Sequence, residues 1–237
     1  LKIEGLNNQD LYTYQYWVSD LSPVDESPSL VKTADPFSTM VLSPFDDPWI
    51  PETSYPNLPE YPYDFGIERE VTVLKTAQES YNWQVEDFEK PKEEDLIIYE
   101  VLIRDFDSER TFQNLIDRID YFKDLNINAI ELMPVMEYEG NESWGYNTAF
   151  HMSVDKFYGP EEKLKEFIDL CHQNGIAVIF DLVMNHVMGR SPMNRMWMND
   201  PDGNGWGEPS EESPYFNEIA THSYGLGNDF NHQSSYT

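Results

Sequence analysis

The sequence predicts an α/β fold: the first three β-α units of a (β/α)8 barrel, with an inserted loop domain after the third strand and an all-β region in front. Residues 96–186 alternate between strand and helix patterns, which indicates a parallel sheet covered by helices. No glycine-rich phosphate loop follows any expected strand, so a barrel is favoured over an open nucleotide-binding sheet. The predicted regions are 1–95, 96–186 and 187–237.

The all-β region is predicted from short alternating runs. Residues 12–18 and 71–74 alternate with a period of two, as β-strands do. Prolines interrupt residues 43–48 and 55–59, and proline cannot donate a hydrogen bond to a sheet, so these stretches are expected to be extended connections.

Three strands and two helices are expected between residues 96 and 186. The predicted strands are 96–103, 129–135 and 176–182, and the last is so continuously apolar that burial on both faces is expected. Apolar residues at three- and four-residue spacing over 112–125 predict one helix. A second helix should open with Pro160 in its first turn, bury Cys171 on its apolar stripe, and end at Asn174-Gly175.

The composition restricts the partners and the compartment only in part. The formal net charge is −29, which disfavours nucleic acids and anionic membrane surfaces as partners. No run approaches the ~20 apolar residues of a membrane span. The single cysteine excludes an internal disulfide, and the oligomeric state stays open.

Two polar and aromatic groups follow the expected strands. Asp181, Asn185 and His186 follow the third strand, where they could bind sugar hydroxyls, share a cation, or simply cap the strand. Trp144 and Tyr146 flank Gly145 after the second strand. They could form a stacking platform for sugar rings, with the glycine letting the ligand approach the backbone, or they could be core residues.

Five motifs together resemble glycoside hydrolase family 13, the α-amylase superfamily. They lie in the family's order over residues 96–190, and the Glu-Leu-Met-Pro-Val strand is most similar to branching, debranching and maltodextrin-hydrolysing members: Leu96–Val101, Ile130–Val135, Trp144–Tyr146, Phe157–Gly159 and Asp181–His186. Stretches 34–37 and 41–45 resemble the end of an immunoglobulin-like E-set carbohydrate-binding module.

The resemblance implies roles for individual residues. Tyr146 would stack on the sugar on the non-reducing side of the cleaved bond, and His186 would bind that sugar's primary hydroxyl. Asp181 would fix an active-site arginine from later in the chain, and Asn185 is a calcium ligand in many members. The Asp nucleophile and the Glu acid/base of a retaining glycosidase would follow strands four and five, beyond Thr237, so these 237 residues alone should hydrolyse nothing.

A second motif arises independently of the family. Asp200, Asp202, Asn204 and Glu211 match the oxygen positions of an EF-hand calcium loop. Prolines at 209 and 214 prevent an exit helix, so a polar surface turn is the alternative. No cofactor is expected to be required, calcium is a candidate ligand, and the five histidines lack zinc-site spacing.

The functional prediction is an α-glucan-active glycosidase or transglycosidase acting on starch, glycogen or maltooligosaccharides. The alternative is a non-catalytic α-glucan-binding protein. A nucleotide-linked oxidoreductase fails for lack of a glycine-rich fingerprint. The sequence leaves the compartment undetermined; family members with such modules are often exported, so an extracytoplasmic location is the expectation.

Overall fold

The structure is a computed structural model that describes residues 3–65, 67–222 and 225–237. The strands are β1 (Leu11–Tyr14), β2 (Tyr16–Ser19), β3 (Leu30–Thr33), β4 (Val41–Leu42), β5 (Val71–Lys75), β6 (Ile98–Val101), β7 (Ala129–Leu132), β8 (Met136–Tyr138), β9 (Thr148–Val154), β10 (Ala177–Phe180), β11 (His186–Val187), β12 (Met198–Asn199), β13 (Glu208–Pro209) and β14 (Asn228–Asp229). The α-helices are α1 (Ile103–Phe106), α2 (Phe112–Asp117), α3 (Ile119–Asp124), α4 (Glu161–Gln173) and α5 (Pro192–Arg195).

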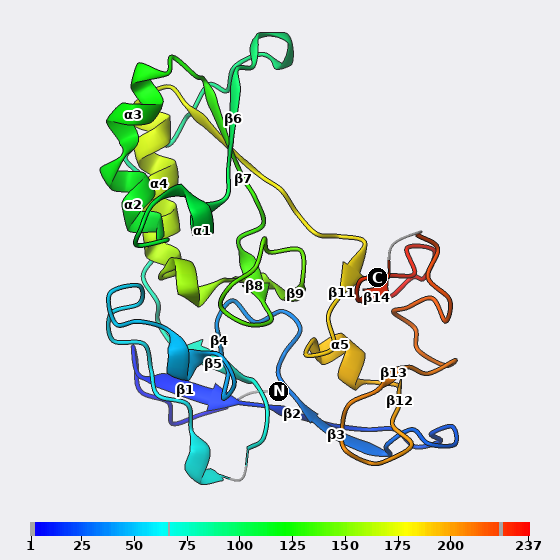
Figure 1. Cartoon of the computed structure of the whole chain (residues 1–237). Helices are drawn as coiled ribbons and strands as arrows, with labels where there is room; N and C mark the ends of the chain where they lie inside the picture. Colours follow the sequence, from blue (N-terminus) through cyan, green and yellow to red (C-terminus); the bar gives the residue numbers. More distant parts are fainter. Residues whose placement is uncertain (1–2, 66, 223–224) are drawn as a thin grey trace.

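The N-terminal region is built from two small antiparallel sheets (Figure 1). One has the order β1-β5-β4, and the other pairs β2 with β3. Leu42 of β4, Val71 of β5 and Tyr61 belong to one buried cluster. Thr72 of β5 is buried as well, so burial along β5 does not follow the alternation of its sequence. The proline-rich stretch after β4 is not fully extended, because Asp47–Trp49 form a 3-10 helix with a proline in its first turn.

A parallel sheet of order β10-β7-β6 lies at the opposite end of the molecule from the N-terminal sheets, with α2, α3 and α4 beside it (Figure 1). Its central strand β7 aligns Ile130 with Tyr99 of β6 and with Val178 of β10. The buried side chains Ile130, Leu132 and Phe167 belong to one hydrophobic cluster between the sheet and the helices. Burial of this apolar surface is the main force that holds the helices on the sheet.

The prediction that the third strand is buried on both faces is wrong. Ala177, Val178 and Ile179 of β10 are only half-buried, and Phe180 is 37% exposed. The strand pairs with β7 and lies at the edge of the sheet, so its far side lacks a neighbouring strand among the described residues. A continuous apolar run shows that a strand can be buried on both faces, but it does not show that neighbouring elements cover both of them.

The predicted helix over 112–125 is interrupted. It divides into α2 and α3 at Arg118, whose backbone leaves helical geometry with φ −102° and ψ 14°. The guanidinium of Arg118 pairs with Asp107 in the loop before α2, at 2.8 Å. Phe112, Leu115 and Phe122 are nevertheless buried as their spacing predicts.

Helix α4 agrees with the sequence in all but one detail. Pro160 is its N-cap and not a first-turn residue. The acidic Glu161 and Glu162 occupy the first turn, where they favour the helix dipole. At the other end Asn174 is the C-cap, and Gly175 has φ +73°, the left-handed conformation that glycine adopts without strain.

The side chain of Cys171 on α4 is fully buried, and burial raises the pKa of its thiol to about 12. Because the thiolate is the reactive form, we expect Cys171 not to react with Ellman's reagent in the folded protein and to react stoichiometrically in urea. Reaction of the native protein at the unfolded rate would contradict this burial.

The described residues of the range 187–237 form one short helix, α5, and short strand pairs. β11 pairs with β14, β12 pairs with β13, and Val187, Phe216 and Phe230 form a small core of their own. No helix in the described part of the chain is long and apolar enough to cross a membrane.

Candidate active-site wall

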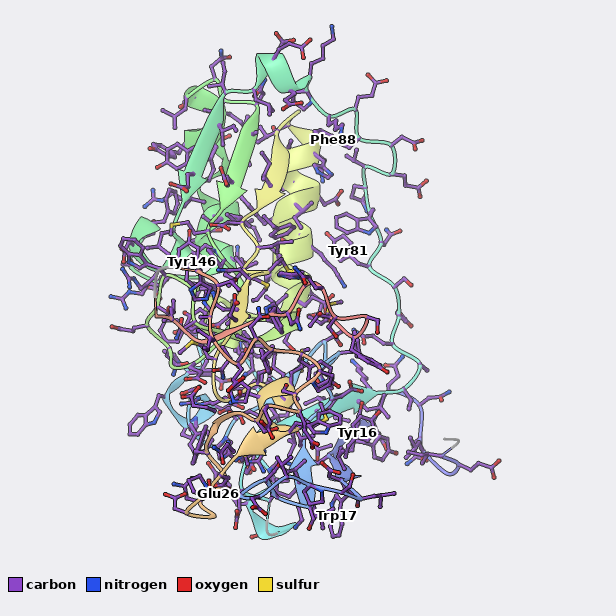
Figure 2. The ribbon with its side chains drawn as sticks, turned by 90° about the vertical axis from the view of Figure 1, so that its right-hand side faces the viewer. Tyr16, Trp17, Glu26, Tyr81, Phe88 and Tyr146 are labelled. Carbon is purple, nitrogen blue, oxygen red and sulfur yellow. The ribbon has the colours of Figure 1, made fainter. Side chains whose placement is uncertain are left out.

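The parallel strands end at one edge of the sheet, and the candidate residues follow them. Asp181 comes directly after β10, and its N–H donates to the carbonyl of Leu132 at the end of β7. The chain after β7 continues into the β8–β9 hairpin, whose connection carries Trp144 and Tyr146. Figure 2 shows Tyr146 near the carboxyl-terminal end of the parallel sheet. In barrels this edge is where loops build active sites.

Tyr146 and Asp181 are in direct contact. The Tyr146 hydroxyl donates to Oδ2 of Asp181 at 2.6 Å. This hydrogen bond, followed by burial, raises the pKa of Tyr146 to about 12. The tyrosine therefore stays neutral and donating at neutral pH. Its half-buried ring is anchored at the hydroxyl end.

His186 contacts the backbone of the β8–β9 connection that carries Tyr146. It is only 3% exposed, and its Nε2 lies 2.7 Å from the carbonyl oxygen of Tyr146. A carbonyl oxygen only accepts, so Nε2–H is the donor in this contact. Nδ1 lies 3.0 Å from Oδ1 of Asn185. The resemblance assigns His186 to a sugar hydroxyl, whereas in this structure its ring nitrogens contact protein atoms.

Trp144, Tyr146, Asp181 and His186 together are called the active-site wall. Trp144 is its solvent-exposed part. Its side chain is 58% exposed, so it is not a core residue. An exposed indole next to an anchored tyrosine ring offers apolar faces for the C–H face of a pyranose.

Gly145 is required by the protein itself. It has φ +91°, and a Cβ at this position would lie 2.4 Å from the carbonyl oxygen of Pro134. The close approach is therefore to the chain leaving β7. The sequence-based explanation, which gave this space to the ligand, is replaced by a packing explanation.

Substituting Gly145 should destabilise the β8–β9 connection that carries Trp144 and Tyr146. We expect Gly145→Ala to lower the free energy of unfolding by about 1–3 kcal/mol, because it combines left-handed strain with a backbone clash. Gly175→Ala is the matched control: Gly175 has φ +73° and nothing within 4 Å of the added carbon. Urea unfolding of both variants measures the difference, and equal losses would show that the clash at Gly145 is relieved.

His151 is a part of the site that the sequence analysis missed. Its Nε2 lies 2.8 Å from the carbonyl oxygen of Val183 and thereby supports the segment after Asp181. Burial lowers its pKa, so the ring is neutral and Nε2–H donates. No local motif marks His151, because its partner is 32 residues away.

The EF-hand-like residues do not form a calcium cage in the structure. Asp202 accepts hydrogen bonds from Asn204, and Oδ2 of Asp200 accepts from the Gly205 N–H at 2.8 Å. Glu211 is exposed and makes no hydrogen bond or ion pair within the described ranges. No group of three or more His, Cys, Asp or Glu side chains in the described residues could hold a metal. The arrangement is that of a turn held by its own side chains. The predicted ligands Asp200, Asp202, Asn204 and Glu211 are not gathered around one point in this turn. Calcium binding here, and at Asn185, stays a prediction.

The chain is similar to known proteins of the α-amylase family. A family model for the α-amylase catalytic domain matches residues 101–217. A malto-oligosyltrehalose trehalohydrolase of Saccharolobus solfataricus is 34% identical over 155 residues, which cover 65% of this chain and 25% of the relative. The 1,4-alpha-glucan branching enzyme GlgB of Halothermothrix orenii is 33% identical over 184 residues, or 72% of this chain and 28% of that enzyme.

A solved structure supports the fold. The crystal structure of a Salmonella typhimurium protein named as a candidate α-amylase matches 86% of this chain and 28% of that chain, with a TM-score of 0.58 and 20% identity. The chain thus spans about a quarter of the length of these relatives.

Proposed function

Since this chain belongs to the α-amylase family, we propose that it is part of a retaining enzyme that cleaves or transfers α-glucosidic bonds in starch, glycogen or maltooligosaccharides. The relatives named as a trehalohydrolase and a branching enzyme act in α-glucan metabolism, which supports this substrate class. The observation that carries the proposal is a pair of contacts at the carboxyl edge of the sheet: the Tyr146 hydroxyl donates to Asp181, and His186 Nε2 contacts the Tyr146 carbonyl. We call these three residues the Tyr146 bracket.

In this proposal the chain supplies one wall of a sugar subsite. Tyr146 stacks on a glucose ring, and Trp144 extends the platform toward solvent. Asp181 holds the tyrosine through Oδ2, and Oδ1 accepts no hydrogen bond from the described residues. That oxygen is available for the active-site arginine that the family resemblance implies. His186 acts as a positioning residue through the Tyr146 carbonyl.

The reacting carboxyl groups are proposed to lie outside these residues. A retaining glycosidase needs two carboxyls about 5 Å apart, one nucleophile and one acid/base. The family resemblance places them after strands four and five. Hydrolysis, branching and transfer differ in loops that would follow the same strands, so the proposal stays at the level of the α-glucosidic bond.

The experiment uses protein expressed from the complete reading frame. Incubation with maltoheptaose and with starch, followed by proton NMR, should show consumed or rearranged α-glucosidic linkages with retention at the anomeric carbon. Inversion, or no turnover of any α-glucan, would overturn the proposed enzyme. Saturable binding without turnover would favour the alternative, a non-catalytic glucan-binding protein.

Binding is tested separately at the platform. Trp144→Ala should weaken maltoheptaose binding by about threefold to tenfold, the range for loss of one aromatic stacking contact. Trp49→Ala is a control of similar exposure, 76% against 58%, and should bind normally. Equal affinities of the two variants would remove Trp144 from the subsite.

A further inference from the structure

A cationic cavity lies between the N-terminal β region and the inserted loops. It has a volume of about 290 Å³ and is lined in part by Lys32 of β3, Arg69, Arg195 of α5, the turn at 203–205, and a single carboxylate, Glu68. In a chain with 15 basic and 44 acidic residues, three cationic side chains around one cavity call for a physical reason.

Arg69 is the buried centre of this cavity. The residue is 8% exposed, and its guanidinium lies 3.5 Å from the ring centroid of Trp206. Nη2 donates to the carbonyl oxygen of Gly205, whereas Nη1 is buried without a hydrogen-bond partner. A buried charged donor without a partner is costly, so Nη1 marks a place where an acceptor is missing.

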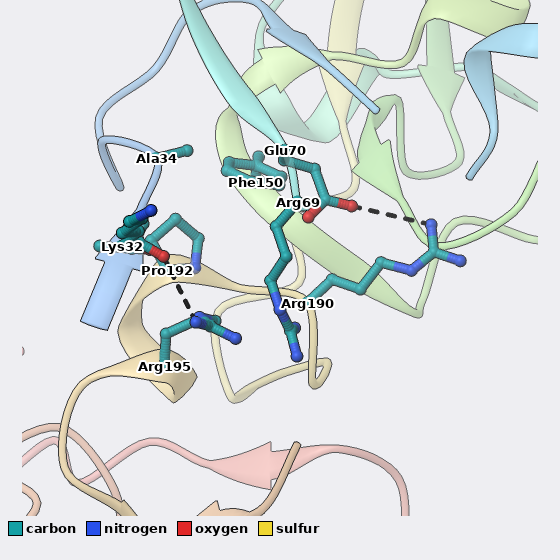
Figure 3. A pocket seen from close by; sticks show the side chains of 9 residues that line it. Lys32, Ala34, Arg69, Glu70, Phe150, Arg190, Pro192 and Arg195 are labelled. Carbon is teal, nitrogen blue, oxygen red and sulfur yellow. Dashed lines mark hydrogen bonds and ion pairs between the residues drawn. The ribbon is translucent and has the colours of Figure 1, made fainter. Parts of the chain in front are cut away.

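Arg195 approaches the same carbonyl from the other side. Its Nη1 donates to Gly205 O at 2.8 Å, its Nη2 contacts the Lys32 carbonyl at 3.4 Å, and its Nε is buried without a partner. Figure 3 shows the Arg69 and Arg195 side chains pointing toward one another, while Arg190 turns away to Glu70.

The two guanidinium groups repel each other, and no carboxylate offsets this by contact. Neither has a carboxylate oxygen within 4.0 Å among the described residues, since Asp200 instead accepts from Gly205 N–H and Glu70 lies next to Arg190. Burial, and then the charge of Arg195, lower the pKa of Arg69 to about 10. The charges of Glu70, Asp200 and Glu68 act on both arginines without contact. The buried Arg69 and the half-buried Arg195 still share one neutral acceptor, so an anion in contact with both would add charge-assisted hydrogen bonds.

We propose that Arg69 and Arg195 bind the phosphate group of inorganic phosphate or of a small phosphate monoester in this cavity. Forked guanidinium donors match the oxygens of phosphate. Phosphate has more acceptor oxygens than a planar carboxylate, so it is better suited to accept from two guanidinium groups at once. Nη1 of Arg69 and Nε of Arg195 are buried donors without a partner, so they reach the anion only if the two side chains shift toward it. The volume admits inorganic phosphate or a sugar phosphate.

The test is isothermal titration calorimetry on protein from the complete reading frame, with inorganic phosphate, glucose 6-phosphate and acetate as separate probes. Phosphate should bind with a stoichiometry of one, and Arg195→Gln should weaken it by at least about tenfold, the effect of losing a hydrogen bond to a charged group. Tighter binding of glucose 6-phosphate than of phosphate would identify a sugar phosphate as the source of the group, and the reverse would identify free phosphate.

The control is Arg110→Gln, because the Arg110 side chain is 39% exposed and pairs with Glu142 at 2.7 Å. This variant should bind phosphate as the unmodified protein does. Arg195→Lys, which keeps the charge but loses the fork, should also weaken binding, and circular dichroism verifies that each variant is folded. Absence of saturable phosphate binding, equal affinity in Arg195→Gln, or acetate binding as tightly as phosphate would overturn the proposal.

Discussion

Replacing Lys156 with methionine is expected to lower the free energy of unfolding by about 3–5 kcal/mol, the typical loss when one partner of a buried ion pair is removed. Lys156 is 2% exposed, and its ammonium pairs with Oε1 of Glu137 and with Oδ1 of Asp47, the latter at 3.3 Å. Asp47 belongs to the N-terminal region and Glu137 to β8. The loss would therefore affect the joint between the two regions.

The physical reason is that two buried carboxylates would lose their counter-ion. Burial alone would lower the pKa of Lys156, but the charges of Glu137 and Asp47 outweigh it and raise the pKa above the ordinary 10.5. The ammonium therefore stays charged at neutral pH and loses its charge only as the pH rises above that value. Burial raises the pKa of Asp47 and raises that of Glu137 to about 7, so the pairing with Glu137 is lost as the pH falls through that value. With native stabilities of about 5–15 kcal/mol, the expected loss is a large fraction of the total.

Urea unfolding followed by circular dichroism measures the effect. Lys163→Met is the matched control, because Lys163 pairs with Glu166 at 2.8 Å with both side chains more than a third exposed, and should change stability by less than about 1 kcal/mol. If Lys156→Met proves too unstable to purify, Lys156→Arg, which keeps the charge in a larger group, should be recovered and be intermediate. Equal stability of Lys156→Met and Lys163→Met would show that the buried pair adds nothing to the fold.

The features that the sequence predicted well depend on neighbours along the chain. The β7 run, the apolar stripe of α4, the left-handed Gly175 and the buried thiol of Cys171 each follow from residues within a few turns or one strand. Local patterns of this kind decide which side of an element is apolar.

The features that it missed depend on contacts across long separations. The ion pair of Lys156 reaches back more than a hundred residues to Asp47, and the break at Arg118 accompanies a bond to Asp107. The half-exposed β10 results from the strand's place at the edge of the sheet, which an apolar run cannot report.

The candidate site shows the same division. The motif residues Tyr146, Asp181 and His186 could be selected from the sequence, and the structure brings them into one bracket. The sequence could not predict that the His186 ring contacts the Tyr146 carbonyl, because this contact depends on how a loop 40 residues earlier is folded. The unpartnered guanidinium atoms of Arg69 and Arg195 likewise could not be predicted, because their burial depends on contacts between distant parts of the chain.

On the proposed function, Asp181→Asn is expected to lower kcat/KM on maltoheptaose by about a hundredfold or more in protein from the complete reading frame. The change removes the charge that the Tyr146 hydroxyl donates to and that a later arginine would pair with. Misplacement of a positioning group by about 1 Å can cost about a hundredfold in rate. The fold should remain, because Asp181 is half-buried and its amide replacement has the same shape.

A double-mutant cycle separates positioning from simple loss of a group. Tyr146→Phe keeps the ring but removes the 2.6 Å hydrogen bond, and a smaller loss of about tenfold is expected. If Asp181 acts partly through Tyr146, the double variant should lose less than the product of the two single effects, since contacting residues are not additive. Independent, multiplying effects would show that Asp181 and Tyr146 act on the substrate separately. Full activity of Asp181→Asn would show that the bracket shapes the loop without serving the reaction.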